Sequence, residues 1–245
     1  MLSIFKFRKK QAFPFERLRT DMHSHLIPGI DDGAPDLETS MELVKGLLEL
    51  GYEKLITTPH IMWDIHKNTS DIILENFAKL EQQLKAEEYG VEMKAAAEYF
   101  LDDYFDEIFS KEQPLLKLDD TKLLVEISFV TPPLRLKEKV FDMLIKGYQP
   151  VLAHPERYPF YHRDKKHYEE LKNAGFHFQA NLLSFTGYYG KAVQEVAEWL
   201  AQKDLINLLG TDLHHPRHLD NLRAMTLTPA LQKILDSSSL LNTEL

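Results

Sequence analysis

The stretch LRLKEKVFDMLIKGYQPVLAHPER, residues 134–157, contains the unit from which the fold is built. Residues 134–146 form an amphipathic stretch that predicts a helix, and Gly147 stands where a helix C-terminal glycine is expected. Residues 150–153 are a short apolar run typical of a buried strand, and His154 follows this run directly. The stretch therefore predicts a helix, then a strand, then a polar side chain at the carboxyl end of that strand.

The same alternation of short apolar runs and longer amphipathic stretches continues along the chain in both directions. It predicts seven strands, at residues 18–23, 54–58, 91–97, 123–127, 150–153, 176–181 and 205–210. It predicts helices at residues 36–51, 69–90, 134–146, 165–174 and 190–203, and a terminal helix that begins at residues 228–229. Alternating strands and helices build parallel sheets, so the predicted fold class is α/β. A closed or nearly closed barrel is the leading architecture, and an open doubly wound sheet is the alternative.

The composition excludes several classes of protein. The chain has 245 residues, which suits a single α/β domain, and it contains no cysteine. Without cysteine there is no disulfide, thiolate zinc site, iron–sulfur cluster or cysteine nucleophile, so a cysteine-based phosphatase mechanism is excluded. No apolar run approaches the roughly 18 residues that span a bilayer. We therefore expect no stable membrane insertion, and a cytoplasmic location fits best.

Charge is unevenly distributed along the chain. There are 29 Lys and Arg residues against 38 Asp and Glu, a net charge of −9, yet residues 1–20 are basic. An acidic body argues against a nucleic-acid groove, because such a groove depends on Lys and Arg beside phosphates. We interpret residues 1–18 as a basic N-terminal extension, either solvated or in contact with an anionic surface or an acidic partner, and residues 19–245 as a single domain.

Six of the seven predicted strands end in residue types that bind metal ions. These residues are His23 and His25, His60, Glu98, Glu126, His154, and Asp212 with His214. A barrel gathers the carboxyl ends of its strands on one face, so we expect these side chains to converge. Alternation from Asp212 places His214 on the same side, while Pro216 turns His215 away, and we therefore expect His214 to be the late ligand.

Five imidazoles and three carboxylates exceed the three or four protein ligands of one zinc ion. The set therefore predicts two or three divalent ions, and imidazole with carboxylate but no thiolate suits Zn, Mn or Fe. Glu98 and Glu126 each follow an apolar run. A carboxylate buried there costs several kcal/mol unless it is paired or binds a cation.

Together, these motifs resemble those of a known superfamily. They are Asp-x-His-x-His at 21–25, Asp31-Asp32-Gly33, Thr58-Pro59-His60, Glu98, Glu126, His154-Pro155-Glu156-Arg157 and Asp212-Leu213-His214. The set resembles the polymerase and histidinol phosphatase (PHP) superfamily, and within it is most similar to the bacterial manganese-dependent protein-tyrosine phosphatases of capsular and exopolysaccharide operons. The resemblance extends from about residue 21 to residue 217. It implies a distorted (β/α)7 TIM-like barrel with a trinuclear metal centre.

The resemblance also implies a cofactor and a ligand allotment. Manganese is the expected metal, with Fe, Zn or Mg as alternatives. The implied groups are His23, His25, Glu98 and Asp212 around one ion, His60, Glu98 and His154 around a second, and Glu126, His23 and His214 around a third. Arg157 resembles the phosphate-binding arginine, and its alternative is a salt bridge to Glu156 or Asp164. Asp32 would be an acid/base or supporting residue, and its alternative is a turn former in Asp-Asp-Gly.

The implied function is hydrolysis of phosphotyrosine by a metal-bridged hydroxide, with a tyrosine autokinase that regulates polysaccharide export as the expected partner. A small-molecule phosphatase such as histidinol phosphatase is the alternative function. A non-catalytic barrel of the kind fused to DNA polymerases is disfavoured by the acidic charge and the complete ligand set. Five aromatic residues after strand ends form either a rim for the substrate ring or ordinary loop packing: Trp63, Phe129, Tyr158, Phe160 and Tyr161. The oligomeric state stays open, a homo-oligomer included.

Overall fold

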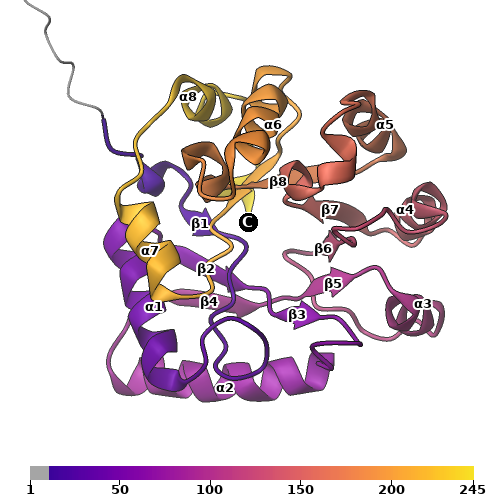
Figure 1. Cartoon of the computed structure of the whole chain (residues 1–245). Helices are drawn as coiled ribbons and strands as arrows, with labels where there is room; N and C mark the ends of the chain where they lie inside the picture. Colours follow the sequence, from indigo (N-terminus) through magenta and orange to yellow (C-terminus); the bar gives the residue numbers. More distant parts are fainter. Residues whose placement is uncertain (1–10) are drawn as a thin grey trace, which may run out of the picture.

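The computed structural model describes residues 11–245, and in it parallel strands curl around a central region with helices on the outside (Figure 1). The strands are β1 (Thr20–Asp21), β2 (Lys54–Thr57), β3 (His60–Ile61), β4 (Glu92–Ala95), β5 (Glu98–Phe100), β6 (Lys122–Glu126), β7 (Gln149–Ala153), β8 (His177–Asn181) and β9 (Leu208–Gly210). The helices are α1 (Leu37–Leu50), α2 (Ser70–Ala86), α3 (Asp103–Ser110), α4 (Leu136–Ile145), α5 (Lys166–Ala174), α6 (Lys191–Gln202), α7 (Pro216–Arg223) and α8 (Pro229–Leu235). Residues 1–10, which include most basic side chains of the predicted extension, lie outside the described residues.

The strands form two parallel sheets. One has the order β1-β2-β4, and the other has the order β3-β5-β6-β7-β8-β9. β3 follows β2 after Thr58 and Pro59, β5 follows β4 after Ala96 and Ala97, and both later strands belong to the second sheet. Within residues 11–245, seven of the nine labelled strands overlap the seven predicted ranges, whereas β3 and β5 lie beyond the predicted strand ends at residues 58 and 97. The predicted α/β class with a parallel sheet is confirmed.

Local signals begin and end most helices where the sequence predicts. Asp36 accepts a hydrogen bond from the Thr39 amide at the start of α1, and Gly51 ends that helix with a φ of 104°. Thr228 caps α8, whose first residue is Pro229. None of the helices within residues 11–245 combines the length and the apolar character needed to cross a membrane.

Some helix predictions are wrong in detail. The helix α2 ends before the predicted Gly90, and Glu88 in the following turn has a left-handed φ of 60°. The helix α4 begins two residues later than predicted because Arg135 has a left-handed φ of 61°. The sequence prediction misses α3 and α7, short helices that follow the capping residues Asp102 and His215. Each is too short for a clear apolar period, so only the cap marks its start.

Among residues 11–245, two apolar clusters make up the core. The larger lies between the strands and the helices and includes Leu123 and Val125. The smaller faces the central region and consists of Met22, Ile56, Ala96, Leu118, Leu124, Val151, Ala153 and Leu208, with Leu241 and Leu245 packed against it. Because successive strand residues point to opposite faces, Glu126 shares the inner face with Leu124. The strand pattern thus places ligand-type side chains at the end of the inner core.

Side chains join β1 and β9, the first and last strands. The Asn242 amide donates to the carbonyls of Thr20 and Leu209 at 3.1 and 2.7 Å, and its oxygen accepts from the Leu209 amide at 2.9 Å. Toward the carboxyl ends of the strands, the Asp21 carboxylate accepts from the amide and the hydroxyl of Thr211 at 2.9 and 2.7 Å. Side chains therefore provide much of the hydrogen bonding between these two strands.

Residues 11–18, the described part of the predicted extension, pack against the rest of the protein. Phe13 and Phe15 are buried in the larger core cluster. The Phe13 amide donates to the Met225 carbonyl at 3.2 Å, and the Leu227 amide donates to the Gln11 carbonyl at 2.8 Å. The segment that precedes β1 is thus held between the core and the loop before α8.

Candidate metal centre

All eight predicted ligands lie at or just beyond the carboxyl end of a parallel strand, and for His60 and Glu98 these strands are β2 and β4, which end three residues earlier. His23 and His25 follow β1, His60 begins β3, Glu98 begins β5, Glu126 ends β6, His154 follows β7, and Asp212 and His214 follow β9. Seven of the eight are buried, and His214 is partly exposed. The structure therefore brings all the predicted ligands together in one cluster, although they are spread over residues 23–214 of the chain.

Glu98 lies at the centre of this cluster. Its Oε2 is 3.2 Å from the Nε2 of His23 and 3.2 Å from the Nδ1 of His60, and its Oε1 is 3.2 Å from the Nε2 of His154. The Nε2 of His25 lies 3.5 Å from Oε2. One fully buried carboxylate thus faces four imidazoles, and this position suits a ligand shared between neighbouring ions.

Glu126 shows the clearest unmet bonding need in the cluster. Its Oε2 has no hydrogen-bond partner among the described residues, and neither does the Nδ1 of His60, which lies 3.7 Å away. Burial, together with the charges of Glu98 and Asp212, raises the pKa of Glu126 well above its ordinary value. A buried carboxyl with an unpartnered oxygen is costly. The donor set and these unpartnered atoms therefore fit a bound cation.

Asp212 and Arg157 form the charged pair of the site. The Oδ1 of Asp212 lies 3.3 Å from the Nε2 of His23, and its Oδ2 accepts from the Nη1 of Arg157 at 2.9 Å. The predicted alternative, a salt bridge from Arg157 to Glu156 or Asp164, does not occur. Glu156 is instead buried and accepts hydrogen bonds from Asn181 and Ser184.

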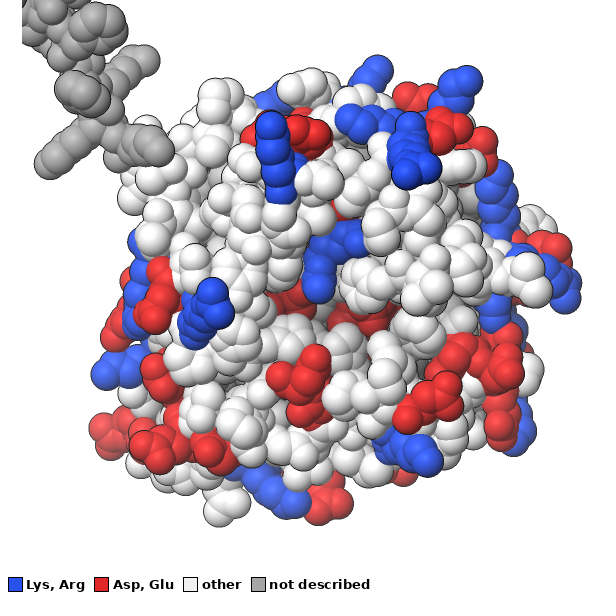
Figure 2. Space-filling model, in the orientation of Figure 1, with Lys and Arg blue, Asp and Glu red and all other residues white. Residues whose placement is uncertain are grey.

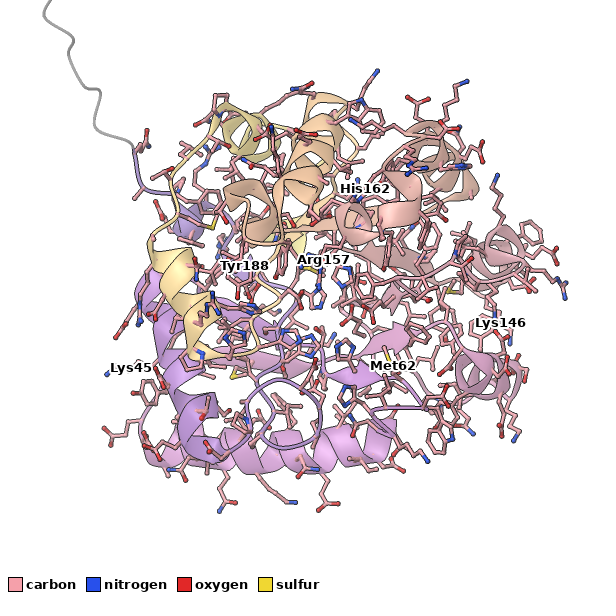
Figure 3. The ribbon with its side chains drawn as sticks, in the orientation of Figure 1. Lys45, Met62, Lys146, Arg157, His162 and Tyr188 are labelled. Carbon is pink, nitrogen blue, oxygen red and sulfur yellow. The ribbon has the colours of Figure 1, made fainter. Side chains whose placement is uncertain are left out.

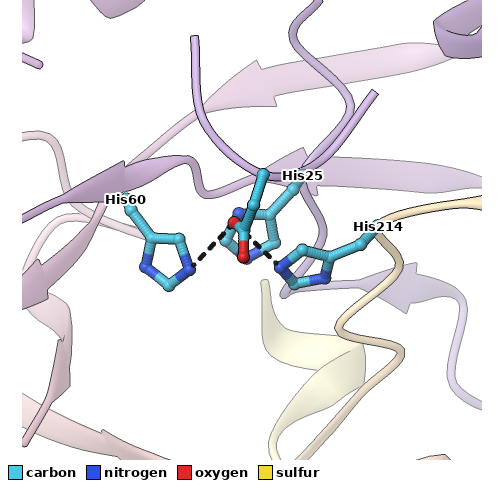
Figure 4. Close-up of side chains that lie close together, drawn as sticks. His25, His60 and His214 are labelled. Atoms are coloured by element: carbon cyan, nitrogen blue, oxygen red, sulfur yellow. Dashed lines mark ion pairs between the residues drawn. The ribbon is translucent and has the colours of Figure 1, made fainter. Parts of the chain in front are cut away.

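Asp31 and Asp32 have different surroundings. Asp31 accepts from the Nδ1 of His25 at 2.7 Å, so it orients that imidazole; sequence reasoning did not single it out, although it belongs to the Asp-Asp-Gly motif. Asp32 is more exposed, and its Oδ1 lies 3.5 Å from the Nε2 atoms of both His60 and His214, the ion pairs dashed in Figure 4. Asp32 therefore belongs to the cluster.

β8, whose end carries no predicted ligand, supplies two supporting amides. Gln179 Oε1 accepts from the Nδ1 of His23 at 2.8 Å, and Gln179 Nε2 donates to Asn181 Oδ1 at 2.9 Å. Asn181 Nδ2 in turn donates to Asp212 Oδ2 at 2.7 Å. Sequence reasoning missed both amides, although two buried polar residues spaced two apart in an apolar strand are a usable signal.

In the described part of the chain, the ligand atoms form four close groups. Within each, they lie within 4.8 Å of one another: His25, Asp32, His60 and His214; His23, His154 and Asp212; His23, His25 and Glu98; His60, Glu98 and Glu126. His214 is thus grouped with Asp32 and not with Glu126, unlike the implied allotment. His215 lies outside these groups, and its Nδ1 accepts from the His218 amide at the start of α7.

The imidazoles of the cluster differ in their protonation. Burial lowers the pKa of His60 to about 4, so this ring is neutral and able to bind a cation. Burial also disfavours the charged form of His23, but the Glu98 and Asp212 carboxylates outweigh burial and raise its pKa above the ordinary value. Where no cation is bound, protons on such imidazoles balance the buried carboxylates.

A cavity of about 620 Å³ opens above the cluster. Figure 2 shows this face hollowed at its centre, with carboxylate groups at the floor. Arg157, after β7, and Met62, after β3, both line the cavity (Figure 3). Of the five aromatic residues predicted to form a rim, Phe129 lines the cavity, whereas Tyr158 is buried and donates its hydroxyl proton to the Ala153 carbonyl. Trp63 is partly exposed and stacks on Tyr104, with ring centroids 4.1 Å apart.

Sequence comparison relates the chain to proteins of capsule synthesis. Residues 19–235 match the family CpsB/CapC, described as capsular polysaccharide synthesis. Tyrosine-protein phosphatase YwqE of Bacillus subtilis (strain 168) is 30% identical over 196 residues, which are 80% of this chain and 77% of YwqE. Tyrosine-protein phosphatase CpsB of Streptococcus pneumoniae is 27% identical over 201 residues, which are 80% of this chain and 82% of CpsB.

Structure comparison agrees. One similar crystal structure comes from work on YwqE of Bacillus subtilis and CpsB of Streptococcus pneumoniae, which are described as metal-dependent tyrosine phosphatases. It has a TM-score of 0.78 and 27% sequence identity, and the match covers 90% of this chain and 89% of that chain. The lactonase Lmo2620 of Listeria monocytogenes shares the fold alone. Its TM-score is 0.51 and its sequence identity 12%, and the match covers 93% of this chain and 88% of that chain. The resemblance predicted from the motifs is confirmed. The chain belongs to the CpsB/CapC family of capsular polysaccharide synthesis.

Proposed function

We propose that this protein hydrolyses phosphotyrosine in proteins with the help of bound divalent ions. The observation that carries the proposal is the cluster of eight imidazole and carboxylate side chains, seven of them buried, beside Arg157 and below one cavity. The relatives YwqE and CpsB are named tyrosine-protein phosphatases, and their activity supports the same reaction here.

The cluster fits two or three divalent ions, manganese first, with Fe, Zn or Mg as alternatives. The residues that would hold them are His23, His25, His60, Glu98, Glu126, His154, Asp212 and His214, with Asp32 beside His214. When bound, such ions polarise phosphoryl oxygens and lower the pKa of water, so that hydrolysis needs no nucleophilic side chain. The chain accordingly needs no cysteine at this site.

Arg157 is suited to hold the phosphoryl group. One terminal nitrogen is fixed on Asp212 at 2.9 Å, and the guanidinium lies at the cavity wall. The planar fork of donors that remains matches phosphoryl oxygens, which a lysine would not do equally well. Arg157 therefore places the phosphorus above the cluster and neutralises charge on its oxygens.

Asp32 differs from Arg157 in what it offers. Its hydrogen bond with His214 lowers the pKa of its carboxyl far below the ordinary range, so the group is ionised at neutral pH. In that state it accepts hydrogen bonds or binds a cation, and it gives up no proton. The phenolate of tyrosine leaves readily, so the need for a protonating side chain is modest.

The cavity walls favour an aromatic substrate. Met62 and Ile65 come from the loop after β3, Phe129 comes from the loop after β6, and all three line the cavity. A phosphotyrosine ring inserted between these loops meets apolar side chains while its phosphate reaches the polar floor. A small polar ester such as histidinol phosphate gains less from these walls.

The finer architecture is part of the same proposal. We interpret the curled sheets as a distorted (β/α)7 barrel over residues 19–245, preceded by the extension 1–18. The isolated parallel bridge between Ser24 and Leu213 supports closure, because it joins the segments that follow β1 and β9. A tyrosine autokinase that regulates polysaccharide synthesis is the expected phosphoprotein, since the family is one of capsular polysaccharide synthesis, and a cytoplasmic location of this protein is part of the proposal.

A substrate panel tests the function. The protein is stripped with a chelator, reloaded with Mn²⁺, and assayed on phosphotyrosine peptides, phosphoserine peptides and histidinol phosphate. We expect phosphotyrosine peptides to react fastest, and we expect His154→Ala and Arg157→Ala to abolish turnover. His167→Ala, outside the cluster, is the matched control and keeps full activity. Histidinol phosphate cleaved hundreds of times faster than any peptide would replace the proposed substrate, and no hydrolysis with any added metal would overturn the enzyme proposal.

A further inference from the structure

Tyr189 lines the same cavity as Arg157 and Asp212, and it belongs to none of the motifs found in the sequence. It lies between β8 and α6, so its position next to the cluster depends on the path of the loop after β8. Two independent features of its surroundings, one of the ring and one of the hydroxyl, suggest a part in substrate binding.

The ring of Tyr189 is stacked on the Arg157 guanidinium. The central carbon of the guanidinium lies 4.5 Å from the ring centroid of Tyr189 and 5.1 Å from that of Phe129. Arg157 follows β7, and the two aromatic residues follow β8 and β6, the strands on either side of it. Aromatic contacts of this kind hold a guanidinium plane in place and leave its N–H edge free for a ligand.

The hydroxyl of Tyr189 has no hydrogen-bond partner among the described residues, and it is buried. The nearby Asn181 side chain donates to Asp212 and accepts from Gln179, and it acts on Tyr189 as a donor toward the phenolic oxygen, which lowers the pKa of the phenol. It therefore supplies no acceptor for the hydroxyl proton. The Oδ2 of Asp212 already accepts two hydrogen bonds, from Arg157 and Asn181. A buried O–H without an acceptor is rare in folded proteins. Its position in the cavity wall suggests that a ligand supplies the acceptor.

The chemistry of that acceptor follows from the neighbours. Burial and the charge of Asp212 raise the pKa of Tyr189 above its ordinary value, so the phenol stays neutral and donates a hydrogen bond at any physiological pH. A donor next to a guanidinium matches an anion with several oxygens, such as a phosphoryl group.

We propose that the Tyr189 hydroxyl donates a hydrogen bond to a phosphoryl oxygen of the bound substrate, as the second protein donor beside Arg157. The inference rests on the proposed phosphatase function for the identity of the substrate. The contact itself requires only that a phosphate group occupies the cavity, so it can be tested with inorganic phosphate.

The test separates the hydroxyl from the ring. Tyr189→Phe removes the hydroxyl and keeps the stacking on Arg157. Tyr168→Phe is the matched control, because the Tyr168 hydroxyl is also buried without a partner but lies outside the cavity. Binding of inorganic phosphate is measured by calorimetry and by the rise in melting temperature, with the protein as purified and after Mn²⁺ loading. We expect about tenfold weaker phosphate binding for Tyr189→Phe and unchanged binding for Tyr168→Phe, since a hydrogen bond to a charged group is lost in the first variant alone.

The unliganded proteins provide a second readout. Because the hydroxyl lacks a partner in the free protein, Tyr189→Phe should keep the melting temperature of the unliganded protein or raise it. A variant that binds phosphate as tightly as the parent, or a parent that binds no phosphate, would overturn the inference. So would a variant whose unliganded form melts several degrees lower. Phosphate binding that depends on Tyr189, in a protein that cleaves no phosphotyrosine peptide, would overturn the proposed function and leave this contact standing.

Discussion

Backbone strain marks two residues of the cluster. His154 and Asp212 have φ values of 33° and 51°. His154 directly follows β7, and Asp212 lies two residues after the end of β9. A left-handed conformation costs an L-residue other than glycine about 1–2 kcal/mol. Both residues offer ligand atoms to the group that also contains His23. Strain of this kind gathers at functional sites, where it fixes a side chain in a direction that a regular strand does not allow.

At the residue scale, Gln179 provides a test of how the ligands are oriented. Gln179→Met keeps the volume and removes the oxygen that accepts from His23, so that imidazole is free to rotate or change tautomer. We expect 10- to 100-fold weaker binding of Mn²⁺, the usual effect of removing a group that orients a metal ligand. Competition with a chromogenic chelator measures it. Gln149→Met, at the opposite end of the neighbouring strand β7, should bind Mn²⁺ like the parent, and equal affinity in both variants would contradict the role of Gln179.

At the scale of elements, one glycine sets the distance between α1 and α7. A Cβ on Gly46 would lie 2.1 Å from the Cδ2 of Leu219, which is fully buried. α7 directly follows the segment that carries His214, so its position against α1 bears on the site. The close approach of these helices therefore depends on a missing side chain.

Gly46→Ala should lower the free energy of unfolding by about 1–3 kcal/mol through overpacking. Urea unfolding measures this, and Gly90→Ala is the control, because no atom lies within 4 Å of a Cβ placed at Gly90. Adding Leu219→Ala to Gly46→Ala should cost less than the sum of the two single changes, because the residues are in contact. Strict additivity would show that the helices move apart without resistance.

The start of β8 gives a pH-dependent prediction. Burial, together with Lys172 and Lys122, lowers the pKa of His177 to about 4, and Asp119 opposes this shift only weakly. The unfolded chain binds the proton near pH 6.5 and the folded chain does not, so stability falls as the pH falls from about 6.5 toward 4. At pH 5 the loss is about 1 kcal/mol after allowance for the partial exposure of the ring.

His177→Gln should remove this dependence. The free energy of unfolding is measured in urea at pH 7.5 and at pH 5 for the metal-free parent and for His177→Gln. On acidification, the parent should lose about 1 kcal/mol more than the variant. Other titrating groups are common to both proteins and cancel in the difference. A difference that is constant with pH would mean that the ring is protonated as readily in the folded state as in the unfolded one.

At the scale of the whole molecule, Asn242 links two strands that are far apart in the sequence. Its side chain makes three hydrogen bonds to the backbones of Thr20 and Leu209 and so connects the first and last strands. Asn242→Ala leaves buried N–H and C=O groups unpaired, and we expect a loss of about 3 kcal/mol in the free energy of unfolding. Asn221→Ala, which removes one exposed helix contact to Arg217, is the control for urea unfolding and should change it by less than about 0.5 kcal/mol. A loss below about 1 kcal/mol in Asn242→Ala would show that β1 and β9 are held by other contacts.

The local pattern was sufficient for much of the fold. Apolar runs and caps such as Asp36 and Thr228 act on neighbours three residues away, so strands and helices could be placed before any tertiary contact was known. The ligand-type side chains were found for a related reason. A parallel topology sends every strand end to the same face, so His60 and His154 could be expected to meet without knowledge of a single contact between them.

The sequence alone therefore determined the α/β class, which strands are followed by ligand-type residues, and the resemblance to the family. Only the tertiary structure decided which side chains support those ligands. Gln179 bonds to His23 across 156 positions of sequence, and Asn242 bonds to Thr20 across 222. Tyr189 and Arg157 meet because β7 and β8 are neighbours in the sheet. A hydrogen bond or a stacking contact depends on distances of 3 to 5 Å in space, and periodicity along the chain carries no information about such distances.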